Sequence, residues 1–259
     1  SGGRLSPTGQ AVEYGKERRI QTTKGIQLLN MKIGGLQRVS LIDYPGKIGA
    51  IIFTQGCNFR CPYCHNPELV DPGQYGPIIP EENALSFLDK RQGKLDAVTV
   101  TGGEPTLQPD LEKFLEEVKN MGYLIKMDTN GSKPDILEKV IRKRLVDYLA
   151  MDIKGPLKRY RQIASVKVDI SKIRRSIQLI TASGIKYEFR TTIVRSQLNL
   201  QDLVSVAKLV KQARLYVLQP FIPIKTLAGP LLSEISYTPE EFSTIRANLE
   251  IEGPHVIVR

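Results

Sequence analysis

The chain has 259 residues, of which 41% are hydrophobic, and its formal net charge is +10 at pH 7. It contains no run near the roughly 18 apolar residues that suggest a membrane span, and its N-terminus lacks the apolar core of a signal peptide. All three cysteines lie between residues 57 and 64, and an odd number at such close spacing argues against a disulfide framework. These features predict a cytoplasmic protein with reduced thiols.

Residues 1–30 have mostly small, polar and basic side chains, which predict a basic N-terminal extension of unknown role. Residues 31–259 are predicted to form one domain. Apolar, β-branched runs indicate buried strands at 49–54, 97–101, 124–128, 148–153, 187–194 and 215–219. Apolar residues at helical spacing predict helices at 81–91, 110–120, 135–144, 170–182 and 200–211. A further helix at 239–249 and a short strand at 255–258 are predicted after them.

Six strands that alternate with helices predict an α/β fold with parallel strands and right-handed crossovers, either as an open sheet or as a barrel-like one. In both folds, ligands bind beyond the carboxyl ends of the strands. The sequences TGGEP (101–105), DTNG (128–131) and MDIK (151–154) lie at such ends. A tight turn could explain each one separately, but polar residues at all six strand ends predict a site there.

The three cysteines suit a soft metal, for which two sites compete. Structural zinc takes four ligands, but His65 is a poor fourth because it directly follows Cys64, and His255 is remote in the sequence. A zinc-stabilised, basic binding module is therefore the non-enzymatic alternative. An iron–sulfur cube is normally held by four thiolates, so three would leave one iron open to a substrate.

Cys57, Cys61 and Cys64 lie in CNFRCPYCHN, which resembles the CxxxCxxC signature of the radical S-adenosylmethionine (SAM) superfamily. The motifs TGGEP, DTNG and MDIK follow it in the order that the superfamily shows. The stretches GGLQRVSLIDYPGK and FTQGCNFRCPYCHNPELV are similar to glycyl-radical enzyme activating proteins, and most of all to the activating proteins of anaerobic ribonucleoside-triphosphate reductase. The resemblance covers about residues 31–220, and it implies a partial (β/α)6 barrel of the radical SAM type.

The resemblance also implies the roles of individual residues. Cys57, Cys61 and Cys64 would bind a [4Fe–4S] cluster whose fourth iron is chelated by SAM. The remaining residues would surround SAM: Gly102, Gly103 and Glu104 at its amino group, Lys154 at its carboxylate, Tyr63 near its adenine, and Arg190 in contact with it or ordering the site. Asp128, Thr129 and Asp152, with Met151, would hold a monovalent cation beside it. Core packing is the alternative for Tyr63, and an ion pair with the barrel's carboxylates is the alternative for Arg190.

The implied activity is that of an activase, which reductively cleaves SAM and removes a hydrogen from a glycine Cα of a partner enzyme. The resemblance favours anaerobic ribonucleotide reductase as that partner. An activase of the pyruvate formate-lyase type and a small-molecule enzyme related to 7-carboxy-7-deazaguanine synthase are the alternatives.

A basic stretch at residues 154–175 contains eight Lys or Arg residues and one acid. It could dock an acidic electron donor, flavodoxin or ferredoxin, or the target reductase, although a solvated helix face is the simpler interpretation. A nucleic-acid partner is not expected, because no recognition motif is present.

Overall fold

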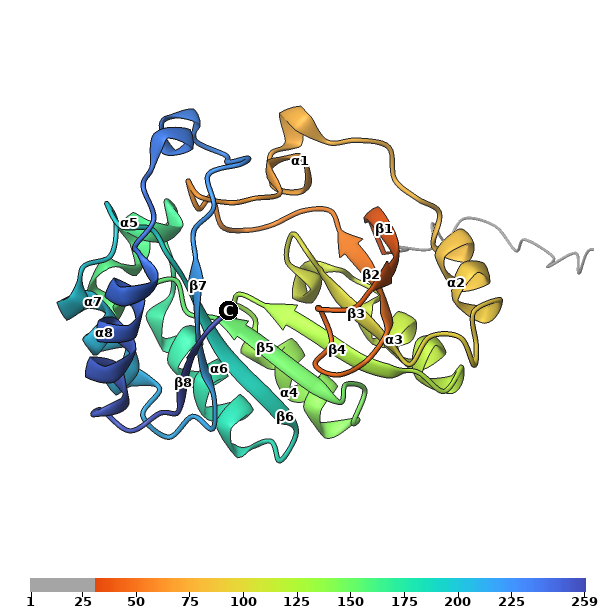
Figure 1. Ribbon diagram of the computed structural model, residues 1–259. Coiled ribbons are helices and arrows are strands. Elements are labelled where there is room, and N and C mark those ends of the chain that lie inside the picture. Colours follow the sequence, from red (N-terminus) through yellow and green to blue (C-terminus); the bar gives the residue numbers. More distant parts are fainter. Residues whose placement is uncertain (1–30) are drawn as a thin grey trace, which may run out of the picture.

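The computed structural model describes residues 31–259, so the predicted extension over residues 1–30 lies outside the described part of the chain. In the described part, eight strands form one sheet in the order of the sequence (Figure 1). Its parallel centre consists of β2 (Gly49–Thr54), β3 (Ala97–Gly102), β4 (Leu124–Thr129), β5 (Tyr148–Asp152), β6 (Lys186–Ile193) and β7 (Tyr216–Pro220). These are the six strands that the sequence predicts, with ends that differ by no more than one residue.

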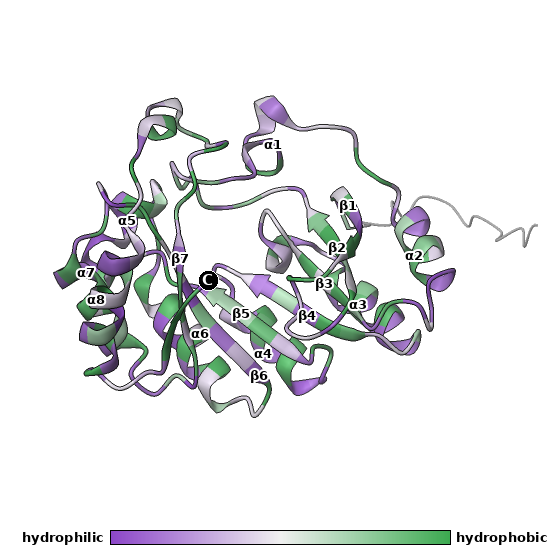
Figure 2. Ribbon diagram, in the orientation of Figure 1, coloured by the Kyte–Doolittle hydropathy of each residue, from purple (hydrophilic) through white to green (hydrophobic). Residues whose placement is uncertain are grey.

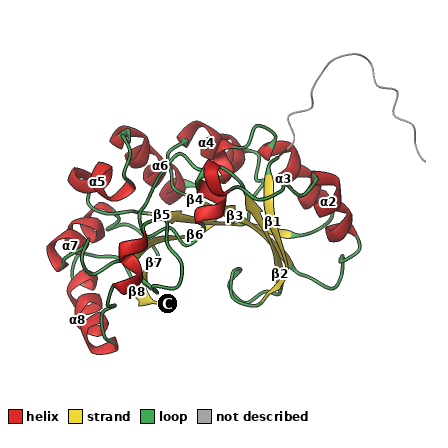
Figure 3. Ribbon diagram, turned by 90° about the horizontal axis from the view of Figure 1, so that it is seen from above, coloured by secondary structure: helices red, strands yellow, loops and turns green. Residues whose placement is uncertain are grey.

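Helices connect the parallel strands and cover one side of the sheet, which curves beneath them (Figure 3). They are α2 (Glu81–Asp89), α3 (Leu111–Asn120), α4 (Pro134–Arg142), α6 (Ile170–Ala182), α7 (Leu200–Leu209) and α8 (Pro239–Glu250). The strands between them are mostly apolar, as Figure 2 shows, because the helices bury one of their faces in the main hydrophobic core. The edge strands β1 and β8 do not pair with each other, so the barrel stays open and the predicted partial (β/α)6 barrel is confirmed.

The strand β1 (Ile33–Ser40) is the main element that sequence patterning did not predict. It pairs antiparallel with β2 and its register shifts twice. Its two glycines and its exposed polar centre explain why no apolar run marked it. At the other edge, β8 (Val256–Val258) pairs parallel with β7, where the sequence predicts a short strand.

Two segments at the carboxyl ends of the strands lie side by side although they are far apart in the sequence (Figure 1). One contains the cysteines and ends in the short helix α1 (Pro67–Val70), and the other is residues 221–236, which follow β7. The Nε2 atom of His65 lies 3.0 Å from the carbonyl oxygen of Ile222. The carbonyl of Pro62 accepts a 2.9 Å hydrogen bond from the Ala228 amide. Among residues 31–259, no helix has both the length and the apolar character needed to cross a membrane.

Candidate active site

A cavity of about 210 Å³ lies at the carboxyl ends of the parallel strands. Such a volume holds far more than one water molecule, so the cavity can admit a small-molecule ligand. The structure brings twelve of the site residues predicted from the sequence to its wall, whereas Met151 is fully buried in the core and does not line it. The twelve are Cys57, Cys61, Tyr63, Cys64, Gly102, Gly103, Glu104, Asp128, Thr129, Asp152, Lys154 and Arg190.

The cysteine loop, residues 57–64, leaves the end of β2 and closes one side of the cavity. Arg60 stabilises it from within, because its guanidinium donates to the carbonyl oxygens of Cys57 and Phe59 at 2.6 and 2.8 Å. The Arg60 amide also donates to Ala164 O, at the end of the short helix α5 (Tyr160–Ala164). Arg60 therefore stabilises the loop through hydrogen bonds of both its side chain and its backbone amide.

The three thiols are buried or half-buried against the core. Burial raises the pKa of Cys57 to about 12, and the carboxylate of Glu104 adds to this rise. Burial also raises the pKa values of Cys61 and Cys64, while the ammonium of Lys154 opposes the rise in both. Without a ligand the thiols are therefore protonated at neutral pH, and binding of iron would release their protons.

The histidine that follows the last cysteine, His65, packs on the segment after β7. Its ring stacks on Phe221, with centroids 5.4 Å apart and planes 6° from parallel, and its Nε2 faces Ile222 O. His255 instead lies beside Glu250, with Nδ1 3.7 Å from the carboxylate. Within residues 31–259, no three His, Cys, Asp or Glu side chains converge where one metal ion could bind. A Cys₃His zinc site thus lacks its fourth ligand among the described histidines.

The motif after β3 is packed against the cysteine loop. Gly102 has a φ of 107°, which disfavours any residue with a side chain. A Cβ atom on Gly103 would lie 2.2 Å from the carbonyl oxygen of Gly56. The amides of Gly103 and Glu104 donate to Thr54 O and Gly56 O, both at 2.8 Å. The two glycines therefore let the end of β3 pack directly on the backbone that leads into Cys57.

The carboxylate of Glu104 is almost fully buried and ties the end of β3 to the end of β4. It accepts hydrogen bonds from the Thr129 hydroxyl at 2.8 Å and from the Asn130 amide at 2.7 Å. The amide and hydroxyl of Thr106 also donate to it. Burial raises the pKa of Glu104, whereas these donors stabilise its charge.

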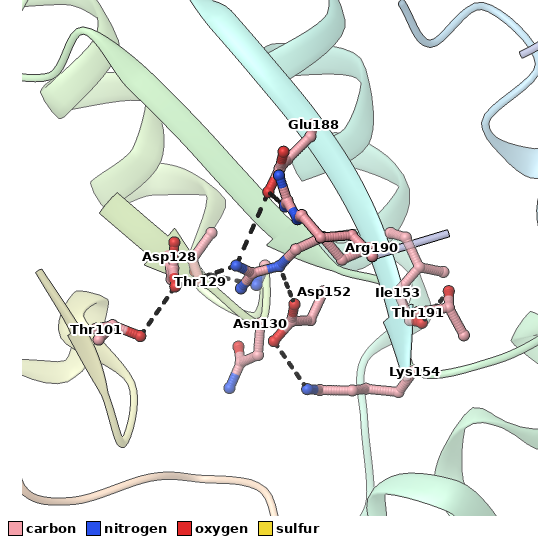
Figure 4. A network of polar contacts seen from close by, with 12 residues as sticks. Thr101, Asp128, Thr129, Asn130, Asp152, Ile153, Lys154, Glu188, Arg190 and Thr191 are labelled. Carbon is pink, nitrogen blue, oxygen red and sulfur yellow. Dashed lines mark hydrogen bonds and ion pairs between the residues drawn. The ribbon is translucent and has the colours of Figure 1, made fainter. Parts of the chain in front are cut away.

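Arg190, on β6, lies at the centre of a polar network on the inner face of the barrel (Figure 4). Its Nε donates to Asp152 at 2.8 Å, and its Nη1 donates to Asp128 at 3.2 Å. Lys126 and Lys154 pair with the same two carboxylates, at 2.7 Å from Asp128 and 3.1 Å from Asp152. The Arg190 guanidinium holds the pKa of both acids below its usual range although burial acts in the opposite direction.

Comparison with known proteins identifies the family of the chain. Residues 51–210 match the family model of the radical SAM superfamily. This chain belongs to that superfamily. The structure gathers the motifs of this superfamily around one cavity. They are the three thiols, the GGE turn and the polar strand ends.

Three curated relatives describe its place among radical SAM proteins. A protein of Methanocaldococcus jannaschii assigned as a glycyl-radical enzyme activating enzyme is 36% identical and covers 74% of this chain and 80% of its own length. The pyruvate formate-lyase-activating enzyme of Clostridium pasteurianum is 27% identical, with 73% and 82% covered. The 7-carboxy-7-deazaguanine synthase of Thermococcus kodakarensis is 25% identical, with 68% and 76% covered.

A solved structure supports the fold. A domain of the pyruvate-formate lyase-activating enzyme from Bacteroides vulgatus superposes with a TM-score of 0.52 at 17% identity, over 63% of this chain and 99% of that domain. The chain is therefore a radical SAM enzyme, and its first relative above places it with the glycyl-radical enzyme activating proteins.

Radical SAM membership implies a [4Fe–4S] cluster and SAM as cofactors, and the cavity fits them in two respects. Its three soft thiol ligands come from one loop, which suits a cluster that keeps one iron free of protein. The buried Tyr63 hydroxyl has no hydrogen-bond partner within the described range, and the Lys154 ammonium lines the same cavity. The ammonium can pair with the carboxylate of a bound amino acid, and the unpaired hydroxyl is a donor left free for a ligand.

Several polar contacts of the site were not predicted from the sequence, although Thr101 and Asn130 lie in the TGGEP and DTNG motifs. Thr101 donates to Asp128 at 3.0 Å, and the side-chain amide of Asn130 donates to Asn58 at 2.9 Å. Lys126 lies inside the run LIKMD, which was interpreted only as a buried strand. A charged residue within an apolar strand, two positions before an aspartate on the same face, was the signal that could have revealed it.

The basic stretch of residues 154–175 divides into paired and free side chains. Lys154 lies in the cavity, Arg159 pairs with Asp202, and Arg175 pairs with Asp135 and Glu138. Five exposed cations have no ion pair within residues 31–259: Lys158, Arg161, Lys167, Lys172 and Arg174. They remain available to an acidic partner.

Proposed function

We propose that this chain is an activase that installs a glycyl radical on a partner enzyme, and that the partner is an anaerobic ribonucleotide reductase. The observation that carries the activase proposal is that one cavity joins the three cysteines to the GGE, DTN and DIK segments. The relative from M. jannaschii supports the same activity. The stretch GGLQRVSLIDYPGK before the cysteine loop favours the reductase as partner.

Each group of residues has a proposed task. Cys57, Cys61 and Cys64 hold a [4Fe–4S] cluster, which with SAM supplies the radical that removes a hydrogen atom from the glycine Cα. Lys154 pairs with the SAM carboxylate, because its ammonium lines the cavity and has only one protein partner, Asp152, in the described structure. Tyr63 lies near the adenine of SAM, and its hydroxyl has no partner in the described structure.

Glu104 has a positioning task in this proposal. Because Thr106, Thr129 and Asn130 already donate to its carboxylate, it fixes the ends of β3 and β4 around the cofactor. Gly102 and Gly103 present bare backbone at the same wall. Arg190 orders the two aspartates beside them rather than serving as a free ligand.

An anaerobic experiment tests the activase. The protein is reconstituted with iron and sulfide, reduced, and studied by electron paramagnetic resonance with and without SAM. A reduced-cluster signal that SAM changes, together with release of 5′-deoxyadenosine, is expected. A cluster indifferent to SAM, or protein that binds zinc instead, would overturn the proposal. Cys61→Ala is the control, since it removes one thiolate.

The partner is tested separately, with three substrates in parallel. Anaerobic ribonucleotide reductase should acquire a glycyl radical signal, whereas pyruvate formate-lyase should not. A pterin-like substrate alone tests the relationship to 7-carboxy-7-deazaguanine synthase, which sequence similarity supports. Radical formation on pyruvate formate-lyase only, or conversion of the small molecule without a protein partner, would assign the same cavity to a different substrate.

A further inference from the structure

Lys126 is buried in the barrel interior although it carries a charge. Its side chain is 3% exposed, and its Nζ lies 2.7 Å from Oδ1 of Asp128. The two residues are two positions apart on β4, so they point to the same face of the strand. A lysine is seldom buried so completely unless it is paired, which makes its placement a feature to be explained.

The carboxylate oxygens of Asp128 and Asp152 are all engaged by donors of the chain itself. Oδ1 of Asp128 faces Lys126, and its Oδ2 accepts from both Thr101 and Arg190. In Asp152, Oδ1 accepts from Arg190 and Oδ2 from Lys154. Every carboxylate oxygen of this pair therefore already contacts at least one donor of the chain.

The third predicted cation ligand is engaged as well. The Thr129 hydroxyl donates to Glu104 at 2.8 Å and accepts from the Gly131 amide at 3.1 Å. The cations Lys126, Lys154 and Arg190 already balance the carboxylates of Asp128, Asp152 and Glu104, while Glu188 beside Arg190 is paired with Arg259. An added alkali-metal ion would therefore have to compete with ion pairs that the chain already makes.

We propose that Lys126 is a built-in cation. Its ammonium takes the position beside Asp128 that an alkali-metal ion would otherwise hold, so SAM binding by this chain requires neither Na⁺ nor K⁺. The inference rests on the proposed function, because it concerns the same cofactor cavity. Arg190 fixes the other oxygen of Asp128, and together the two cations keep the carboxylate oriented and neutralised.

The first test uses the wild-type protein. Its affinity for SAM is measured anaerobically, after reconstitution, in KCl, NaCl and tetramethylammonium chloride at one ionic strength, so that screening is equal. We expect dissociation constants that agree within about twofold, since no ion contributes a contact. A loss of about tenfold or more in tetramethylammonium would show that a metal ion is needed and would overturn the proposal.

The second test removes the ammonium. Lys126→Ala leaves room for an ion beside Asp128, and Lys126→Met removes the charge while filling that space. We expect Lys126→Ala to bind SAM about tenfold more weakly in tetramethylammonium and to recover most of that loss in K⁺. Lys126→Met should bind weakly in every salt. Equal affinity of Lys126→Ala in all salts would refute the built-in cation.

A thermal readout separates this inference from the proposed function. The unfolding midpoint of the protein without its cluster is measured in the same salts, and only Lys126→Ala should gain stability from K⁺ over tetramethylammonium. Lys119→Ala is the matched control, because Lys119 also lies 2.7 Å from an aspartate, Asp147, but at a partly exposed site outside the cavity. Failure of the wild type to bind SAM would reject the proposed function, while the midpoints would still decide the role of Lys126.

Discussion

Gly103→Ala tests how closely the end of β3 must pack on the cysteine loop. The new Cβ would lie 2.2 Å from the carbonyl oxygen and 2.7 Å from the carbonyl carbon of Gly56. Side-chain Cβ atoms hardly ever come closer than 3.0 Å to such atoms, so the backbone next to Cys57 must move. No flexible side chain is available to absorb the contact, since the three nearest atoms all belong to Gly56 backbone.

The cost has two parts. Overpacking in a close-packed region costs about 1–3 kcal/mol. The shift also lengthens the hydrogen bonds from Gly103 to Thr54 O and from Glu104 to Gly56 O, each worth about 0.5–1.5 kcal/mol. The free energy of unfolding should therefore fall by about 2–4 kcal/mol. Because Gly56 precedes Cys57, the variant should also retain less iron than the wild type.

Gly76→Ala is the matched control, since no heavy atom lies within 4 Å of its added Cβ and its φ is not in the left-handed region. Denaturant unfolding, followed by circular dichroism on the protein without its cluster, gives the free energy of unfolding, and iron analysis after reconstitution gives the cluster content. The control should stay within about 0.5 kcal/mol of the wild type. If Gly103→Ala does the same and binds full iron, the packing argument is wrong.

Three further predictions concern neighbouring groups. Glu104→Gln should lower the free energy of unfolding by about 1–3 kcal/mol, because one oxygen becomes an NH₂ group that faces the amide donors of Thr106 or Asn130. His65→Ala should keep the iron content of the wild type and instead speed proteolysis near Ile222, since its ring contacts that segment and not the thiols. Stability should fall on acidification below about pH 4, because folding lowers the pKa values of Asp128 and Asp152. The contribution of these two carboxylates to the free energy of unfolding is complete above their unfolded pKa and is lost as the pH drops toward their folded pKa. Asp152→Asn should reduce this acid dependence.

Each of the three has a comparison that could contradict it. Unchanged stability of Glu104→Gln in urea would mean that the carboxylate is not needed for these hydrogen bonds. Loss of iron in His65→Ala, to the extent seen in Cys61→Ala, would return His65 to the list of metal ligands. An acid limb in Asp152→Asn identical to that of the wild type would assign the acid sensitivity to other carboxyl groups. Asp71→Asn is the surface control for Asp152→Asn, because the pKa of Asp71 is also lowered but Asp71 lies outside the polar network around Arg190.

The comparison of sequence with structure is clearest for the sheet. Local apolar runs placed the six parallel strands to within one residue, because strands buried under helices must be apolar along their length. The same signal could not reveal β1, whose partly exposed edge tolerates glycine and polar residues. Its antiparallel pairing with β2 depends on contacts beyond the strand itself.

The sequence by itself placed the polar motifs at one rim, since the rule that ligands bind at the carboxyl ends of parallel strands needs only the order of strands and motifs. The resemblance to radical SAM proteins then named individual residues, and of these all except Met151 line the cavity. Tertiary structure alone decided how those residues interact with one another. In the folded chain the carboxylate of Glu104 binds Thr129 and Asn130, and the His65 ring stacks on Phe221. These contacts join segments that are far apart in the chain, so they form only when the sheet and helices pack around the core.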